Sequence, residues 1–138
     1  LEEELQIIES QHARKVENKL DLVTGIINAE QVARFQKLVQ EIHIEPHLMQ
    51  FIAKIVHNTR ENPFLYLGAS PRASLAILQA SKAFAAMQGR DFVTPEDVKR
   101  SAVPVLQHRV IVTPEREMEG VNSKQVITQM LESIEIPR

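Results

Sequence analysis

The sequence contains no cysteine and no tryptophan, and these absences exclude several functions. Without cysteine the chain has no disulfide framework, no thiolate nucleophile and no cysteine metal ligand. Aromatic residues make up 4% of the chain, too few for the stacking platforms that bind single-stranded nucleic acid. No apolar run approaches the roughly 18 residues that a membrane-spanning helix needs. The lack of cysteine also fits a reducing compartment, so we expect a cytoplasmic location.

An excess of charge of one sign is equally absent. The net charge at pH 7 is -2, from 16 basic and 18 acidic residues. Since no cluster of lysine and arginine stands out, nucleic acid is not an expected partner. At 138 residues the chain is one domain or slightly more. Because it opens on Leu1 rather than methionine, we expect an excised piece of a longer protein.

The familiar catalytic and nucleotide-binding motifs are missing as well. There is no Gly-x-x-x-x-Gly-Lys-Ser/Thr phosphate loop, no dinucleotide fingerprint and no Gly-x-Ser-x-Gly elbow. His43 and His47 are spaced like a pair of metal ligands. However, Pro46 works against a continuous helix through both, and the order is not His-Glu-x-x-His. We therefore predict no metal site, and no catalytic apparatus in this chain alone.

What the sequence does have is apolar residues at helical spacing, which predict an all-α bundle of about five or six helices. The stripes are Val32, Phe35, Leu38, Val39 and Ile42; Leu48, Phe51, Ile52, Ile55 and Val56; Ala73, Ala76, Ile77, Ala80, Phe84 and Met87; and Val126, Ile127, Met130, Leu131 and Ile134. At most one very short strand pair is expected, with Ile42–Ile44 and Phe92–Val93 as partners. Both segments are short, apolar and followed by a helix that proline initiates.

Residues 15–27 interrupt the helical period and form a candidate boundary. They contain an alternating stretch at 19–23, and Gly25 is a helix breaker. We therefore divide the chain into residues 1–27 and residues 28–138.

Capping patterns predict where the helices begin and end. Thr94 and Asp97 have the three-residue spacing of a capping box, and Asn28 with Gln31 has the same spacing. Ser123 is predicted to cap the last helix. The helix that begins near Ser70 is expected to stop at Gly89.

Arg72 is the most informative residue. Ser70 is a good N-cap, Pro71 suits the first helical position, and Gly68 can let the chain turn sharply before them. Arg72 is therefore predicted in the first turn of a helix, where free N–H groups and the helix dipole favour an anion. A cation there costs the helix about 0.3–1 kcal/mol. We infer that Arg72 interacts with an anion outside the helix.

Two stretches carry a resemblance to a known family. They are Leu67-Gly68-Ala69-Ser70-Pro71-Arg72-Ala73 and Gly89-Arg90-Asp91-Phe92-Val93-Thr94-Pro95-Glu96-Asp97-Val98. With Thr59-Arg60 before Pro63, and Pro104-Val105-Leu106 before His108-Arg109, residues 28–138 resemble the C-terminal lid of MoxR-family AAA+ ATPases. The Gly-Ala-Ser-Pro-Arg-Ala motif is the most specific of these matches.

The resemblance implies a role for Arg72. At its position such lids carry the second sensor, an arginine that reaches the terminal phosphate of ATP bound to the ATPase core. Pro71, Ala69 and Ala73 would line the nucleotide side. For three other arginines, Arg60, Arg90 and Arg109, we favour ion pairs or cap contacts inside the lid.

The resemblance also implies a longer parent protein. Its core would bind ATP and Mg, close under the lid and form a ring, often a hexamer. It would couple hydrolysis to remodelling or maturation of protein complexes, together with proteins that carry von Willebrand factor A domains. Residues 1–27 would be the last core helix and a linker to the lid.

The residues alone leave a second class open. A stand-alone helical module of the histone-fold type, which binds protein or DNA without any ATPase, would share the Thr94-Pro95-Glu96-Asp97-Val98 cap. Against it, the predicted helix from Ser70 to Gln88 is shorter than the long central helix expected of a histone fold. The near-neutral charge also fits DNA binding poorly.

Overall fold

The computed structural model describes residues 1–13 and 23–136 and contains two compact units, Leu1–Ala33 and Arg34–Arg138. In the first unit, helix α1 spans Glu2–Ala13 and exposes its side chains throughout. Residues 23–27 form no helix or strand, as predicted, and the rest of the predicted break lies outside the described residues.

Helix α2 spans Ala29–Glu41 and begins at the predicted capping box. Asn28 Oδ1 accepts the Gln31 N–H at 2.8 Å, and Gln31 Oε1 accepts the Asn28 N–H at 2.9 Å. The apolar stripe of this helix is not buried, however: Phe35 is 50% and Leu38 46% exposed. Periodicity therefore identified an amphipathic helix but not the partner of its apolar face.

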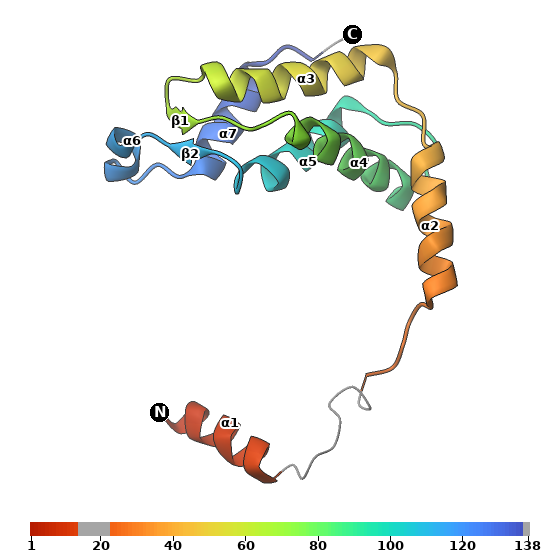
Figure 1. Cartoon of the computed structure of the whole chain (residues 1–138), viewed down its shortest axis with the longest axis vertical. Coiled ribbons are helices and arrows are strands. Elements are labelled where there is room, and N and C mark those ends of the chain that lie inside the picture. Colours follow the sequence, from red (N-terminus) through yellow and green to blue (C-terminus); the bar gives the residue numbers. More distant parts are fainter. Residues whose placement is uncertain (14–22, 137–138) are drawn as a thin grey trace. The chain divides into compact units, whose positions relative to one another are not determined.

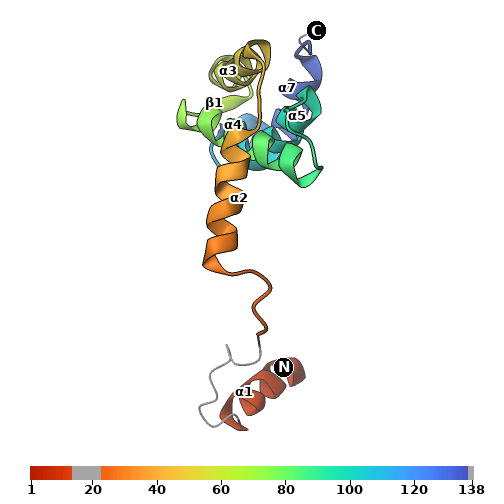
Figure 2. The same cartoon turned by 90° about the vertical axis from the view of Figure 1, so that its right-hand side faces the viewer.

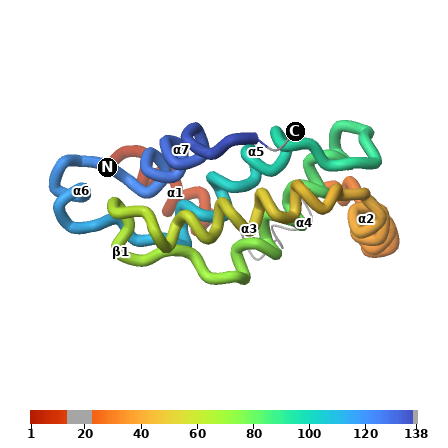
Figure 3. The backbone as a smooth tube through the Cα atoms, turned by 90° about the horizontal axis from the view of Figure 1, so that it is seen from above, coloured from red at the N-terminus to blue at the C-terminus, as the bar shows by residue number. Residues whose placement is uncertain are grey.

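Four helices of the second unit enclose its core: α3 (Pro46–Glu61), α4 (Arg72–Met87), α5 (Pro95–Leu106) and α7 (Ser123–Ser133). Helix α3 contacts α4, α5 and α7, and α4 packs most extensively on α5 (Figure 1 and, from above, Figure 3). Figure 2 views α3 almost along its axis, with α5 and α7 beside it. Each of the four helices contributes a fully buried side chain, namely Ile55, Ile77, Leu106 and Ile127. The predicted all-α class is confirmed.

Most of the predicted inward faces are correct, and one needs correction. All five apolar residues predicted for α3, and all five predicted around α7, are buried. On α4 the buried face is Ala73, Ile77, Ser81 and Ala85, whereas Met87 is 78% exposed. The buried face includes the polar Ser81, whose hydroxyl donates to the Ile77 carbonyl at 2.7 Å and lies 2.8 Å from the Ser101 hydroxyl of α5. Hydrophobicity alone cannot reveal such a buried polar pair.

The two-stranded sheet lies elsewhere than predicted. Strand β1 (Leu65–Leu67) pairs antiparallel with β2 (Ile111–Val112). The predicted partners, Ile42–Ile44 and Phe92–Val93, form only an isolated parallel bridge between His43 and Phe92. In it the His43 N–H donates to the Asp91 carbonyl at 2.8 Å, and the Val93 N–H donates to the His43 carbonyl at 3.0 Å. The two segments do meet, but they make a single bridge rather than a ladder.

The start of α5 and the end of α4 follow the predicted chemistry, whereas the start of α7 is shifted by one residue. Thr94 and Asp97 form the predicted capping box at the start of α5, and Gly89 ends α4 with a φ of 71°. The cap of α7 is Asn122, paired with Gln125, and not Ser123 as predicted. Ser123 is instead the first helical residue, and its hydroxyl donates to the Gln107 carbonyl at 2.8 Å. A short helix, α6 (Pro114–Met118), lies between β2 and α7.

Candidate functional site

The segment that leads from β1 into α4 is attached to the end of α3 by a buried threonine. Thr59, in the last turn of α3, is fully buried. Its hydroxyl donates to the Val56 carbonyl at 2.6 Å and accepts the Ala69 N–H at 2.9 Å. Because Ala69 is also fully buried, this hydrogen bond is shielded from water and fixes the approach to α4.

Gly68 is needed for close approach rather than for the sharp turn that we predicted. Among the described residues, only Gly89 and Gly120 are glycines with positive φ. A Cβ on Gly68 would instead lie 2.6 Å from both the Thr59 carbonyl oxygen and the Arg60 Cα. Since both of these are backbone atoms, no side-chain rotation can relieve the overlap. The loop and the end of α3 are therefore in backbone contact.

Helix α4 begins one residue later than predicted, and Ser70 does not cap it through its side chain. Pro71 already has helical dihedral angles, and no side-chain cap bond is present at this end. The Ser70 carbonyl accepts the Ala73 N–H at 2.9 Å, and the Pro71 carbonyl accepts the Ser74 N–H at 3.0 Å. Two amides of this helix end are thus already paired, so an anion would be held mainly by a side chain.

Arg72 is the candidate for that side chain. It is the first residue of α4, it is exposed, and it forms no hydrogen bond or ion pair with any described residue. Of the neighbours predicted to line a nucleotide, Pro71 is exposed, but Ala69 and Ala73 are fully buried. Burial removes these two methyl groups from the candidate surface, because a side chain in the core has no area to offer a ligand. The site is reduced to Arg72 beside Pro71.

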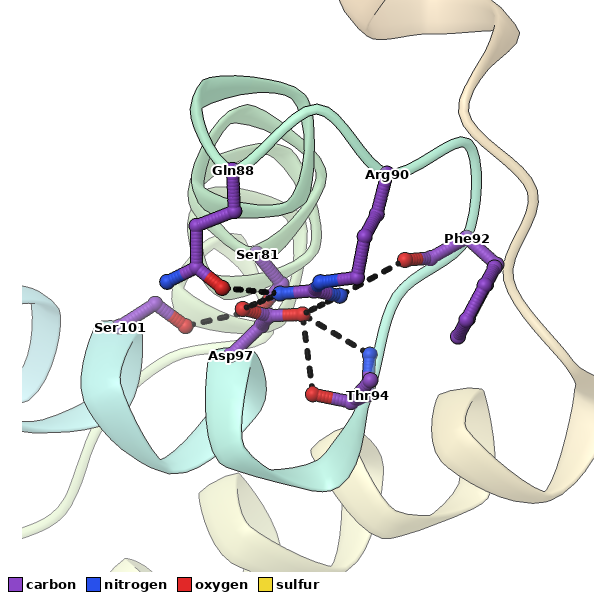
Figure 4. Close-up of polar contacts among 7 residues, drawn as sticks. All are labelled: Ser81, Gln88, Arg90, Phe92, Thr94, Asp97 and Ser101. Carbon is purple, nitrogen blue, oxygen red and sulfur yellow. Dashed lines mark hydrogen bonds and ion pairs between the residues drawn. The ribbon is translucent and has the colours of Figure 1, made fainter.

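Arg90, at the other end of α4, is held within the fold, as we favoured from the sequence (Figure 4). Its guanidinium donates to both carboxylate oxygens of Asp97 at 2.8 Å, to the Gln88 side chain at 2.7 Å and to the Phe92 carbonyl at 3.0 Å. Asp97 also accepts the Thr94 N–H and hydroxyl. Both terminal nitrogens of the guanidinium thus donate twice inside the domain.

The electrostatics of this pair are consistent with a structural role. Burial of the Asp97 carboxylate opposes its ionisation, but hydrogen bonds from Arg90 and Thr94 outweigh this effect and lower the pKa of Asp97. The hydrogen bond to Asp97 likewise raises the pKa of Arg90. Both groups are therefore charged at neutral pH. Their charges neutralise each other, so they are not available to an outside ligand.

The other arginines and histidines considered from the sequence add little to the candidate site. Arg60 is exposed, and its backbone lies against Gly68. Arg109 donates to the imidazole of the adjacent His108 at 3.2 Å, a contact inside the lid. His43 pairs with Glu45 at 3.0 Å, and the described residues contain no group of three or more His, Cys, Asp or Glu arranged to hold a metal. Arg72, exposed and without a partner among the described residues, is therefore the candidate for anion binding.

Sequence reasoning missed Thr59 as part of the site. The residue was noted only within the Thr59-Arg60 match, yet a signal was present in its spacing. Thr59 follows Ile55 and Val56 on the buried face of α3, so helical spacing alone places a hydroxyl in the core. A buried hydroxyl needs a hydrogen-bond partner, and the nearby loop supplies one.

Known proteins show the same domain. The family model described as an AAA lid domain matches residues 57–130, more than half of the chain. The uncharacterized protein YeaC of Bacillus subtilis is 29% identical over 98% of this chain, and the chaperone MoxR1 of Mycobacterium tuberculosis is 29% identical over 99%. A crystal structure from Cytophaga hutchinsonii, of a protein provisionally assigned as an ATPase, superposes with a TM-score of 0.78 at 29% identity over 99% of the chain.

The chain therefore belongs to the AAA lid domain family. Within that family its relatives confirm the MoxR-type lid that the motif around Arg72 indicated. The chain spans 41%, 37% and 43% of the lengths of the three relatives, so these proteins also contain large parts that this chain does not match. In the described residues no helix is both long and apolar enough to cross a membrane.

Proposed function

We propose that this chain is the lid of a MoxR-type AAA+ ATPase and that Arg72 is its second sensor. The observation that carries the proposal is the exposed guanidinium of Arg72, which begins α4 and has no partner among the described residues. A planar guanidinium forms two parallel hydrogen bonds to a phosphate, and a helix N-terminus adds a favourable field for the same anion. The terminal phosphate of ATP on the ATPase core is the anion we assign to it.

The contact would make lid position depend on the nucleotide. With the terminal phosphate present, Arg72 holds the lid closed and helps to neutralise charge that develops during hydrolysis. After hydrolysis and phosphate release the contact is lost and the lid is free to rotate. Lid rotation would then drive chaperone-like remodelling or maturation of protein complexes.

The remaining parts of this proposal concern the parent, the longer ATPase that would carry this chain. Its core would supply the phosphate loop and the Mg-binding acidic residues, and residues 1–27 would be its last helix and a linker. The parent would act in the cytoplasm as a ring, often a hexamer, together with proteins that carry von Willebrand factor A domains. The histone-fold alternative is less favoured. It expects one long central helix, whereas α4 has 16 residues, the same length as α3.

Arg72→Ala in the parent tests the proposal. We expect turnover to fall at least about tenfold, which corresponds to ~1.4 kcal/mol of lost transition-state stabilisation. Arg72→Lys should recover only part of the loss, since a point charge replaces a planar fork. Turnover is measured as phosphate release at saturating ATP and Mg. Unchanged turnover in Arg72→Ala would remove Arg72 from the assigned role.

A second prediction concerns the 138-residue chain alone. It should neither hydrolyse ATP nor bind it tightly, because one arginine at a helix N-terminus is only part of a phosphate site. Isothermal titration calorimetry with ATP and Mg measures the affinity. Micromolar binding would mean that the chain holds a complete nucleotide site that the proposal does not include.

A further inference from the structure

The fully buried hydroxyl of Thr59 lies between two parts of the chain that meet just before Arg72. It donates to the Val56 carbonyl one turn earlier in α3 and accepts the N–H of Ala69, ten residues later in the chain. The first bond fixes the orientation of the hydroxyl, so its lone pair points at the loop. The second bond fixes the loop three residues before Arg72.

Gly68 attaches the same loop a second time. Its Cα lies so close to the end of α3 that an added Cβ would be 2.6 Å from backbone atoms of Thr59 and Arg60. Two consecutive residues, Gly68 and Ala69, are thus held to one helix end by a backbone contact and a buried hydrogen bond. The exposed side chain of Arg72 therefore projects from a start of α4 that is fixed against α3.

We propose that Thr59 is a positioning residue for Arg72, an inference that rests on the proposed function. Transition-state contacts depend on placement within about 0.5 Å, and a displacement of about 1 Å can cost large factors in rate. Removal of the Thr59 hydroxyl leaves the Ala69 N–H buried without an acceptor, so the loop must shift to find one. The shift moves Arg72, which is the first residue of α4.

The test compares four variants of the parent ATPase, and one control variant, with the unmodified enzyme. Thr59→Val removes the hydroxyl and keeps the shape, and should lower kcat by about fivefold or more with a smaller change in the KM for ATP. Thr59→Ser keeps the hydroxyl and should stay within about twofold of the unmodified enzyme. The third variant is Arg72→Ala, and the fourth is a double variant that combines Thr59→Val with Arg72→Ala.

The double variant separates positioning from general damage. If Thr59 acts through Arg72, then Thr59→Val causes no further loss once Arg72 is alanine. If Thr59 only stabilises the domain, the two losses multiply, and the inference is overturned.

Ser101→Ala is the matched control. Like Thr59, Ser101 is fully buried and lies within hydrogen-bond distance of the carbonyl three residues earlier, and its tertiary contacts are with the Ser81 hydroxyl and the Ile77 carbonyl of α4. It lies in α5, away from the loop, so its loss should lower the melting temperature and leave kcat unchanged at temperatures well below melting. A loss of kcat in Ser101→Ala equal to that of Thr59→Val would overturn the inference.

The outcomes distinguish this inference from the proposed function. Full turnover in Arg72→Ala contradicts the function itself. A large loss in Arg72→Ala with full turnover in Thr59→Val leaves the function intact and overturns only the positioning role. If Thr59→Val does not fold, hydrogen exchange in the unmodified chain decides. Slow exchange of the Ala69 amide supports the inference, and exchange as fast as that of an exposed loop amide contradicts it.

Discussion

Arg72 begins helix α4 and Arg90 follows its end, yet their guanidinium groups have opposite surroundings. Arg90 donates to Asp97, Gln88 and Phe92, and its side chain is 24% exposed. Arg72 is exposed and has no partner among the described residues. One end of the helix therefore has an arginine whose partners are inside the domain, and the other end has an arginine that is exposed and has no partner among the described residues. The chemistry of the residue is the same, and only the availability of acceptors differs.

The largest expected effect on stability is at the Arg90 end. Asp97→Ala removes the acceptor of a bidentate ion pair and of the Thr94 cap, and we expect it to lower the free energy of unfolding by about 2–4 kcal/mol. Chemical denaturation of the 138-residue chain, followed by circular dichroism, measures the loss. Glu96→Ala is the matched control, since Glu96 is the exposed neighbour and should change stability by less than about 0.5 kcal/mol. Equal stabilities of the two variants would contradict the assignment.

The second-largest expected effect on stability is in the loop that precedes Arg72, rather than at the arginine itself. Gly68→Ala places a Cβ 2.6 Å from backbone atoms of α3, and we expect a loss of about 1–3 kcal/mol as the loop is pushed away. A Cβ added at Gly25 would have no atom within 4 Å, so Gly25→Ala should leave stability unchanged or raise it slightly. Denaturation curves of both variants make the comparison. A Gly68→Ala chain as stable as Gly25→Ala would show that α3 and the loop are not in the contact described.

A smaller loss of stability is expected when the pH is lowered. Because the pKa of Asp97 is lower in the folded chain, its contribution to stability is complete above the unfolded pKa of about 3.9. That contribution is lost as the pH falls through the lowered folded pKa. Between pH 7 and about pH 2, the stability of the unmodified chain should therefore fall more than that of Asp97→Asn, which cannot titrate there. Parallel losses in the two chains would mean that the ion pair adds no pH-dependent stability.

Much of the fold could be predicted because its signals are local. Capping boxes at Asn28 and Thr94 depend on residues three apart, and both are present. The apolar faces of α3 and α7 repeat every three to four residues, which is enough to identify a buried face. The motif around Arg72, together with the matches at residues 89–98 and elsewhere in residues 28–138, indicated the MoxR-type lid.

What could not be predicted depends on partners far along the chain. Strands β1 and β2 have three and two residues, too few for any alternation, and they pair across more than forty residues. Ser81 is buried with its hydroxyl bonded to the Ile77 carbonyl of its own helix and to Ser101 of another helix, a partner twenty residues away. The apolar face of α2 was recognised, but its exposure was not, since a periodic pattern carries no information about what covers it. The same limit applies to the site: the Arg72 motif was visible, whereas the Thr59 contact needs the fold.

The smallest expected effect on stability belongs to Arg72 itself. Arg72→Ala removes an exposed side chain and relieves a cation at a helix N-terminus, so the free energy of unfolding should change by no more than about 0.5 kcal/mol.

The most direct test of the account is therefore turnover and melting temperature measured together in Arg72→Ala and Arg90→Ala of the parent. We predict that Arg72→Ala loses at least about tenfold in turnover with an unchanged melt, whereas Arg90→Ala has a clearly lower melting temperature. Full turnover or a collapsed melt in Arg72→Ala would contradict the account.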